Sequence, residues 1–221
     1  MNVTTGCELK KTYARRFESR LAYRNQVWRL LVDDFFQGFV PSDASVLDLG
    51  CGYGVFINAV NCASKYGMDL NPDARNHLDA SVRFFEQDCS TPWPLETNTL
   101  DVVFTSNFLE HLPSKQTISQ TFAEAYRCLR PGGRFIAMGP NIKYLPGEYW
   151  DFFDHHMALT ELSLQEGLEL AGFQSEQVVG RFLPYTMATG PTYPLAFLRM
   201  YLRLRFAWRF FGKQFLVIAT K

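Results

Sequence analysis

The chain has 221 residues, of which 47% are hydrophobic and 15% aromatic, enough for one well-packed domain and too apolar for a disordered chain. Its 22 basic and 22 acidic residues give a net charge of zero. Proteins that bind nucleic acid through its phosphates usually carry a basic excess, so no nucleic acid partner is expected.

The five cysteines are scattered and form no C-x-x-C pair, which argues against a disulfide framework or a structural zinc site. Residues 1–20 contain no apolar segment typical of a signal peptide, and no run of about 18 uncharged apolar residues predicts a membrane span. We therefore expect a cytoplasmic protein that folds as a single domain over residues 1–221.

Helix-forming residues dominate positions 15–39, and residues 1–42 are expected to form a helical cap. Strands and helices then alternate, which predicts an α/β fold with a mostly parallel sheet and helices on both faces. In such folds, ligands bind at the carboxyl ends of the strands. The expected strands cover residues 45–49, 65–70, 82–87, 100–106, 134–138, 177–182 and 215–220, and the expected helices cover 55–60, 114–129 and 160–171.

The first expected strand ends in a loop, residues 48–54, in which glycines alternate with other residues. Glycine permits a sharp turn and the close approach of a ligand. The acid that opens the loop, Asp48, would repel a phosphate but suits a cationic or zwitterionic ligand. Asp69 and Asp88 end the next two strands, where carboxylates can accept from ribose hydroxyls and from an adenine amino group. Each acid alone is as well explained as a turn or cap residue, but together they predict a nucleoside ligand.

Five segments resemble, in order, the motifs of class I methyltransferases that use S-adenosylmethionine (SAM): VLDLGCGYG, YGMDLNP, FFEQDCSTPWPL, LDVVFTSNFLEHL and CLRPGGRFIAMGPN. The resemblance covers residues 45–173. It implies a Rossmann-like, doubly wound sheet of seven strands, mostly parallel, with an antiparallel last strand. It also implies SAM as the cofactor, whose sulfonium and amino groups fit the acid in the loop.

The resemblance further implies that the loop glycines line the cofactor, that Asp69 holds the ribose and that Asp88 contacts adenine. Ser106 and Asn107 would face the methionine part, and the ring of Tyr53 either stacks on the ligand or fills a gap. The candidate cofactor residues are Asp48, Gly50, Cys51, Gly52, Tyr53, Gly54, Asp69, Leu70, Asp88, Cys89, Ser106 and Asn107.

Residues 139–156 follow the fifth expected strand and combine aromatic with polar side chains, as small-molecule pockets do. The candidate substrate-binding residues are Asn141, Tyr144, Tyr149 and Trp150. Histidine titrates near neutral pH and can act as a general base. The candidate catalytic residues are His155, His156, Glu110 and His111, each of which has helix capping or loop ordering as the alternative role. No metal is expected, because Asp154, His155 and His156 lack a separate third ligand.

The fourth strand is not followed by the Asn- or Asp-Pro-Pro-aromatic motif of enzymes that methylate base amino groups, and no Pro-Cys motif is present. We therefore expect a small-molecule or lipid- or carrier-linked acceptor, methylated at oxygen. One alternative is a non-enzymatic SAM-binding protein of the same fold. Another is a nicotinamide-dependent oxidoreductase, which the G-x-G-x-G spacing and the preceding acid disfavour.

Residues 183–213 form a long insert before the last strand, and positions 195–213 contain five basic residues and no acid. On a single helix these basic residues would fall within an arc of roughly 160°. The opposite side would be apolar, with Phe197, Met200, Tyr201, Leu204, Ala207, Trp208 and Phe211. This pattern predicts peripheral contact with an anionic membrane, and the alternative is that the apolar side packs on the domain. The tail, residues 197–221, together with residues 145–173, also resembles methyltransferases of surface-glycan or lipid-linked sugar pathways.

Overall fold

The computed structural model describes residues 20–185 and 192–221. Its centre is a seven-stranded sheet of order β3-β2-β1-β4-β5-β7-β6. β7 is antiparallel to both of its neighbours, and the other pairs are parallel, which confirms the expected topology. The strands are β1 (Ser45–Leu49), β2 (Ser64–Asp69), β3 (Val82–Glu86), β4 (Leu100–Ser106), β5 (Leu129–Pro140), β6 (Gln174–Val179) and β7 (Gln214–Thr220).

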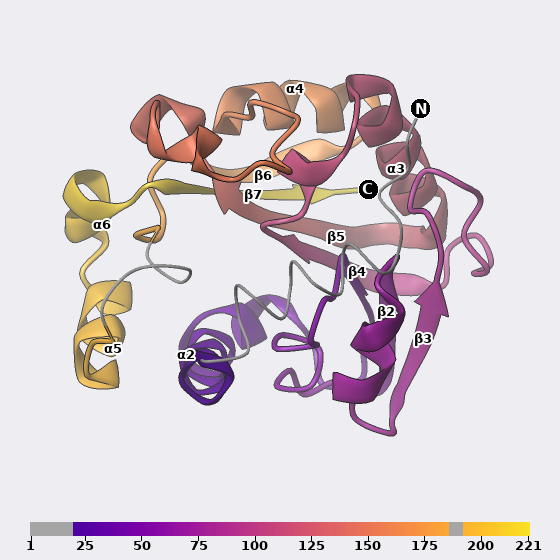
Figure 1. The fold of residues 1–221 in the computed structure, drawn as a ribbon. Coiled ribbons are helices and arrows are strands. Elements are labelled where there is room, and N and C mark those ends of the chain that lie inside the picture. Colours follow the sequence, from indigo (N-terminus) through magenta and orange to yellow (C-terminus); the bar gives the residue numbers. More distant parts are fainter. Residues whose placement is uncertain (1–19, 186–191) are drawn as a thin grey trace.

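Helices cover both faces of the sheet (Figure 1). Helices α3 (Lys115–Cys128) and α4 (Glu161–Leu170) pack on one face, and α2 (Leu21–Asp34), α5 (Leu195–Arg203) and α6 (Arg205–Phe211) pack against the core of the other. Successive residues of a strand point to opposite faces, so Val46 lies in one core and Leu47 in the other. A sheet buried on both faces explains why β4 reads as a continuous apolar run.

The expected helical cap is described from residue 20 onward, and residues 1–19 lie outside the described residues. Its described part consists of α2 and a short 3-10 helix, η2 (Phe36–Phe39). Trp28 and Phe36 from these elements are fully buried against Phe104 of β4, with ring centroids 5.1 to 6.0 Å from that ring. This aromatic contact fixes α2 on the sheet face next to β1 and β4.

Three expected boundaries differ from the structure. Residues 55–60 form successive turns rather than a helix, with bonds such as Asn58 N–H to Gly54 O. β5 begins at Leu129, because α3 runs directly into it. β6 covers Gln174–Val179 rather than 177–182, because Gly172, with a φ of 103°, turns the chain straight out of α4 into the strand.

The basic segment is also not one helix, because it breaks at Leu204 into α5 and α6. Leu202 and Trp208 are both buried, and six positions would place them about 120° apart around one continuous helix. The break lets both side chains reach the core, where the Trp208 indole donates to the Tyr201 carbonyl at 3.0 Å. Among the described residues, no helix is long and apolar enough to cross a membrane.

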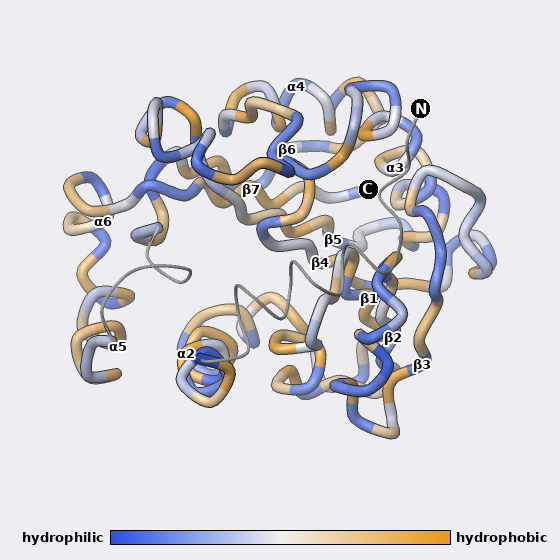
Figure 2. The backbone as a smooth tube through the Cα atoms, viewed as in Figure 1, coloured by the Kyte–Doolittle hydropathy of each residue, from blue (hydrophilic) through white to orange (hydrophobic). Residues whose placement is uncertain are grey.

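The burial in this segment corrects the predicted apolar side. Leu198 and Leu202, from the predicted basic arc, pack toward the core. The exposed side chains instead include several of the predicted apolar side, and Figure 2 shows hydrophobic positions along α5 and α6 at the edge of the molecule. We call the exposed residues Phe197, Met200, Phe206, Phe210 and Phe211 the apolar face.

Candidate active site

Strand order reverses between β1 and β4, and the carboxyl ends of these strands flank the crevice where α/β folds bind ligands. The glycine loop leaves β1 at this edge. Gly50, Gly52 and Gly54 have φ values of 71°, 50° and 69°, a left-handed conformation that favours glycine. A Cβ at Gly50 would lie 2.2 Å from the Phe108 ring, so this position also has no room for a side chain.

Asp69 ties the loop to the end of β2. Its Oδ2 accepts from the Gly52 N–H at 2.8 Å, and its Oδ1 accepts from the Asn71 N–H at 2.8 Å. Each carboxylate oxygen has a second lone pair, so Asp69 retains acceptors for two ribose hydroxyls. The next residue, Leu70, is 40% exposed, which places an apolar side chain at the ligand edge of the sheet.

Asp48 is buried beneath the loop, and burial raises its pKa to about 8. A hydrogen bond from the Ile57 backbone lowers this pKa, but by less than burial raises it. The charge of Asp69 raises it further. A ligand with positive charge would favour the ionised carboxylate. Cys51 is also buried, and burial raises the pKa of its thiol well above the usual range, so it acts as a neutral packing group.

The ends of β3 and β4 complete this edge. Asp88 Oδ1 accepts from the Ser90 N–H and hydroxyl at 2.8 and 2.7 Å, the turn role that the sequence left open. Cys89 is buried, and its thiol accepts from the Thr121 hydroxyl. Asn107 has a φ of 49° and donates to the Ser106 hydroxyl, while its buried Oδ1 has no hydrogen-bond partner among the described residues. That oxygen is an acceptor at the expected methionine end.

The Tyr53 side chain packs against the protein itself. Its side chain is 7% exposed, and its ring stacks on the His77 ring with centroids 3.8 Å apart. Of the two roles that the sequence left open, this contact corresponds to packing.

The segment after β5 lies over the same edge, and its four predicted substrate residues have different surroundings. Asn141 is buried and donates to Glu161 Oε2 and the Gly180 carbonyl, at 2.6 and 2.9 Å. Tyr149 is fully buried, and its hydroxyl donates to the Met157 carbonyl. These two residues hold the segment in place, whereas Trp150 is 52% exposed and Tyr144 lies at the surface of a groove described below.

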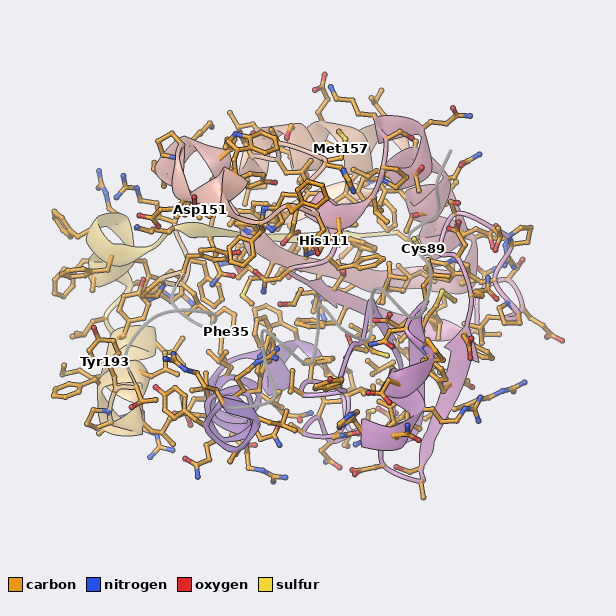
Figure 3. All side chains as sticks on the ribbon, viewed as in Figure 1. Phe35, Cys89, His111, Asp151, Met157 and Tyr193 are labelled. Carbon is orange, nitrogen blue, oxygen red and sulfur yellow. The ribbon has the colours of Figure 1, made fainter. Side chains whose placement is uncertain are left out.

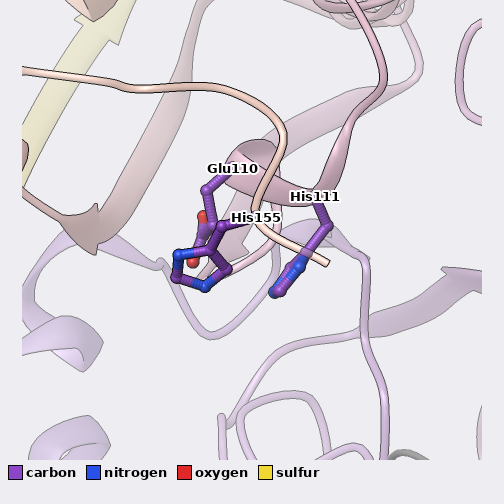
Figure 4. Close-up of side chains that lie close together, drawn as sticks. All are labelled: Glu110, His111 and His155. Carbon is purple, nitrogen blue, oxygen red and sulfur yellow. The ribbon is translucent and has the colours of Figure 1, made fainter. Parts of the chain in front are cut away.

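Glu110, His111 and His155 form what we call the polar cluster (Figure 4). The first two lie on the short 3-10 helix η4 (Leu109–His111), which directly follows β4. His155 reaches them from the later segment, because the backbone N–H groups of His156 and Met157 donate to the Glu110 carbonyl at 2.8 and 3.0 Å. One nitrogen or oxygen atom from each of the three side chains lies within 4.8 Å of the others. His156 is exposed and is not part of the cluster.

Glu110 is the most buried member of the polar cluster, with 1% of its surface exposed. Burial raises its pKa to about 8, and the nearby charge of Asp154 adds to the rise. Its Oε1 has no hydrogen-bond partner among the described residues. The carboxyl group is therefore mostly protonated near neutral pH, and the ionised fraction, which grows as the pH approaches 8, can accept a proton.

The structure also shows an arginine-rich groove that the sequence did not predict. It is open, measures about 580 Å³ and lies between β6 and α6. Arg181, from the end of β6, lies 3.9 Å from the Tyr144 ring centroid, and Arg205 lies 5.6 Å from that of Trp208. Arg181 had no local signal, since its partners come from segments that only the fold brings together. The groove is lined by Tyr144, Glu161, Val178, Val179, Gly180, Arg181, Arg205, Trp208 and Arg209.

Solved structures share this fold along nearly the whole chain. A SAM-dependent methyltransferase from Archaeoglobus fulgidus is 19% identical, with a TM-score of 0.68 over 90% of this chain and 94% of that one. A SAM-dependent methyltransferase from Mesorhizobium loti is 18% identical, with a TM-score of 0.61 over 84% of this chain and 95% of that one. The fold is therefore that of class I SAM-dependent methyltransferases.

Sequence similarity points to the same class. Residues 47–137 match the family model described as a methyltransferase domain, and SAM is the cofactor that this similarity and the shared fold imply. A protein of Mycolicibacterium smegmatis named as a SAM-dependent methyltransferase is 31% identical over 143 residues, which are 62% of this chain and 54% of that protein. A methyltransferase of Mycobacteroides abscessus is 30% identical over 118 residues, 48% of this chain and 44% of that one. The chain thus spans about half the length of these relatives.

Proposed function

We propose that the protein transfers a methyl group from SAM to a hydroxyl oxygen of an acceptor that lies against the polar cluster. The observation that carries this proposal is the buried Glu110 carboxyl, with its pKa raised to about 8, beside two histidines at the carboxyl end of β4. SAM needs no activation by the protein, because its sulfonium already makes the methyl carbon electrophilic. A hydroxyl acceptor, by contrast, must lose a proton near neutral pH, which a buried base can accept.

The residues around the glycine loop fit SAM. Asp48 and the free Oδ1 of Asn107 provide acceptors for its amino group, and Asp69 provides acceptors for its ribose. In the reaction the acceptor oxygen forms a bond to the methyl carbon as the sulfur–carbon bond breaks, and the polar cluster takes the hydroxyl proton. The protein contributes mainly by aligning these atoms and excluding water.

The arginine-rich groove favours an acceptor that carries a phosphate or pyrophosphate. Arginine binds phosphate with several parallel hydrogen bonds, and three arginines line this one groove. Tyr144, which lines the groove, follows the end of β5 by four residues. A Cβ at Gly139, near that end, would lie 3.5 Å from Glu110 Oε2. These positions support an acceptor that extends from the polar cluster past the end of β5 to the groove.

The apolar face supports a lipid-linked form of such an acceptor. Its aromatic side chains are 58 to 72% exposed, and Arg203, Arg205 and Arg209 are exposed on the same two helices. From residue 177 to 221 the chain has seven basic residues and no acid. Aromatic and basic side chains together bind the interface of an anionic bilayer. We propose that α5 and α6 rest on such a surface while the carrier phosphate occupies the groove.

Methyl transfer from labelled SAM to a panel of hydroxyl compounds, free and joined to polyprenyl phosphate, tests the proposal. We expect label in a phosphate-bearing acceptor. Glu110→Gln should lower kcat by about 10²- to 10⁴-fold, the usual effect of removing a general base, while SAM affinity is retained. Transfer only to amine acceptors, or full activity of this variant, would count against the proposal.

A further inference from the structure

The polar cluster has a composition that a catalytic base alone does not require. It brings one carboxylate and two imidazoles together from segments 45 positions apart, and Glu110 and His155 are 1% and 6% exposed. The chain has four histidines, and two of them meet here (Figure 4). The sequence disfavoured a metal because the Asp154–His156 run lacked a separate ligand, and η4 supplies that ligand.

The surroundings orient these groups as metal ligands are oriented. His111 Nδ1 lies 2.9 Å from the Asp154 carbonyl and 3.4 Å from the Asp154 carboxylate, and these two contacts orient the ring. Metal-binding histidines nearly always hold their other ring nitrogen on a carbonyl or carboxylate in this way. Figure 3 shows His111 near the centre of the view and Tyr193 beside α5 at its edge. Glu110 Oε1 is buried with no hydrogen-bond partner among the described residues, and no lysine or arginine among them forms an ion pair with this carboxylate.

We infer that Glu110, His111 and His155 bind one divalent transition-metal cation. Two histidines and one glutamate form a ligand set of catalytic zinc sites and of non-haem iron sites, and both keep coordination positions open. The three donor atoms lie within 4.8 Å of one another, close to the roughly 3–4 Å that separates ligands of one cation. A cation would also give the buried Glu110 Oε1 a partner, which this oxygen lacks among the described residues.

The role of the cation rests on the proposed function. The polar cluster lies at the edge where the acceptor hydroxyl is expected, so an open coordination position would take that oxygen. Coordination lowers the pKa of a bound hydroxyl and fixes its direction toward the methyl group. The cluster would then activate the acceptor through the cation, with Glu110 acting as a ligand. The hydroxyl proton would pass to solvent water as the oxygen bonds to the methyl carbon and the bond from that carbon to the SAM sulfur breaks.

Metal binding is measured on the full chain, free of any histidine tag and treated with a chelator, with Co²⁺ and Zn²⁺ alone. We expect one equivalent of Co²⁺ to give the intense visible absorption of a four- or five-coordinate site, and one Zn²⁺ to displace it. Glu110→Gln, His111→Ala and His155→Ala should each weaken binding by about 100-fold or more, above the 10- to 100-fold typical of a residue that only supports a ligand.

His77→Ala and His156→Ala are the matched controls, because these are the two histidines outside the cluster. They should change affinity by less than about 3-fold. SAM titration of each variant shows that the fold is retained. The inference is overturned if the full chain gives no cobalt spectrum, or if cluster and control variants bind equally. Methyl transfer by the metal-free protein would contradict the role of the cation and leave the proposed function standing. Metal binding without methyl transfer to any acceptor would support the metal site and contradict the proposed function.

Discussion

Two buried carboxyl groups, those of Asp48 and Glu110, lie at opposite ends of the expected reaction path, and burial raises the pKa of each to about 8. Both are therefore largely protonated at neutral pH in the free protein. Cations that bind beside them would favour ionisation. The donor end and the acceptor end of the site thus share one electrostatic property, and each supplies a test.

The raised pKa of Asp48 predicts that SAM binding releases a proton. In the free protein its carboxyl holds the proton below about pH 8, and the positive charges of SAM favour the carboxylate. At pH 7 the heat of SAM binding should therefore depend on the ionisation enthalpy of the buffer, with proton release of up to one per SAM. Calorimetry in phosphate and in Tris measures this. Heats that agree in both buffers would show that Asp48 does not change its protonation.

The raised pKa of Glu110 predicts that its replacement by glutamine stabilises the protein by an amount that depends on pH. In the unfolded chain its pKa is near the ordinary 4.5, whereas the folded value is about 8, so unfolding releases a proton between these pH values. The carboxyl therefore lowers stability progressively as pH rises from about 4.5 to 8. Glu110→Gln should raise the Tm of metal-free protein at pH 8, by about 2–4 °C per kcal/mol recovered, and have little effect at pH 4.5. An equal effect at both pH values would contradict the raised pKa.

At the scale of elements, the turn from β1 into the glycine loop depends on its contact with the residue after β4. An alanine at Gly50 would need a left-handed φ and would meet the Phe108 ring at 2.2 Å. Gly50→Ala should therefore cost about 2–4 kcal/mol of unfolding free energy in urea, from the left-handed conformation and the overpacking together, and should abolish SAM binding. Gly38→Ala is the control, because no atom lies within 4 Å of its added Cβ. Equal stabilities of the two variants would show that the loop adapts.

The elements that were predictable from sequence are those with local signals. Apolar strands, the alternation of strand and helix, and the acids at the ends of β1 and β2 all lie within short segments. The break between α5 and α6 was not predictable, because it depends on how Leu202 and Trp208 pack into the core of the folded chain. The same holds for the site. Asp69 beside the glycine loop follows from strand order, whereas the contact between Glu110 and His155, and the position of Arg181 over Tyr144, exist only in the folded chain.

At the scale of the whole molecule, zero net charge conceals an uneven distribution. The apolar face and the nearby arginines predict sedimentation with vesicles that contain anionic phospholipid, and weaker binding at high salt because salt screens charge. Replacing both Phe206 and Phe210 with Ser should lower vesicle affinity by about 10-fold or more, since burying each exposed ring is worth up to a few kcal/mol. Leu170→Ser is the control, because this residue of α4 is 84% exposed on the opposite face of the sheet. Absence of binding at low salt would contradict the membrane proposal.

The central claim is that the edge formed by β1, β2 and β4 is a SAM site, and calorimetric titration of SAM into the wild type and Asp69→Ala tests it most directly. Asp69 both holds the Gly52 N–H and faces the expected ribose. We predict one SAM per chain and an affinity at least about 100-fold lower in the variant, roughly the 2.7 kcal/mol expected from losing charged hydrogen bonds. Asp79→Ala, at an exposed acid, should bind as the wild type does. Unchanged SAM affinity in folded Asp69→Ala would contradict the account.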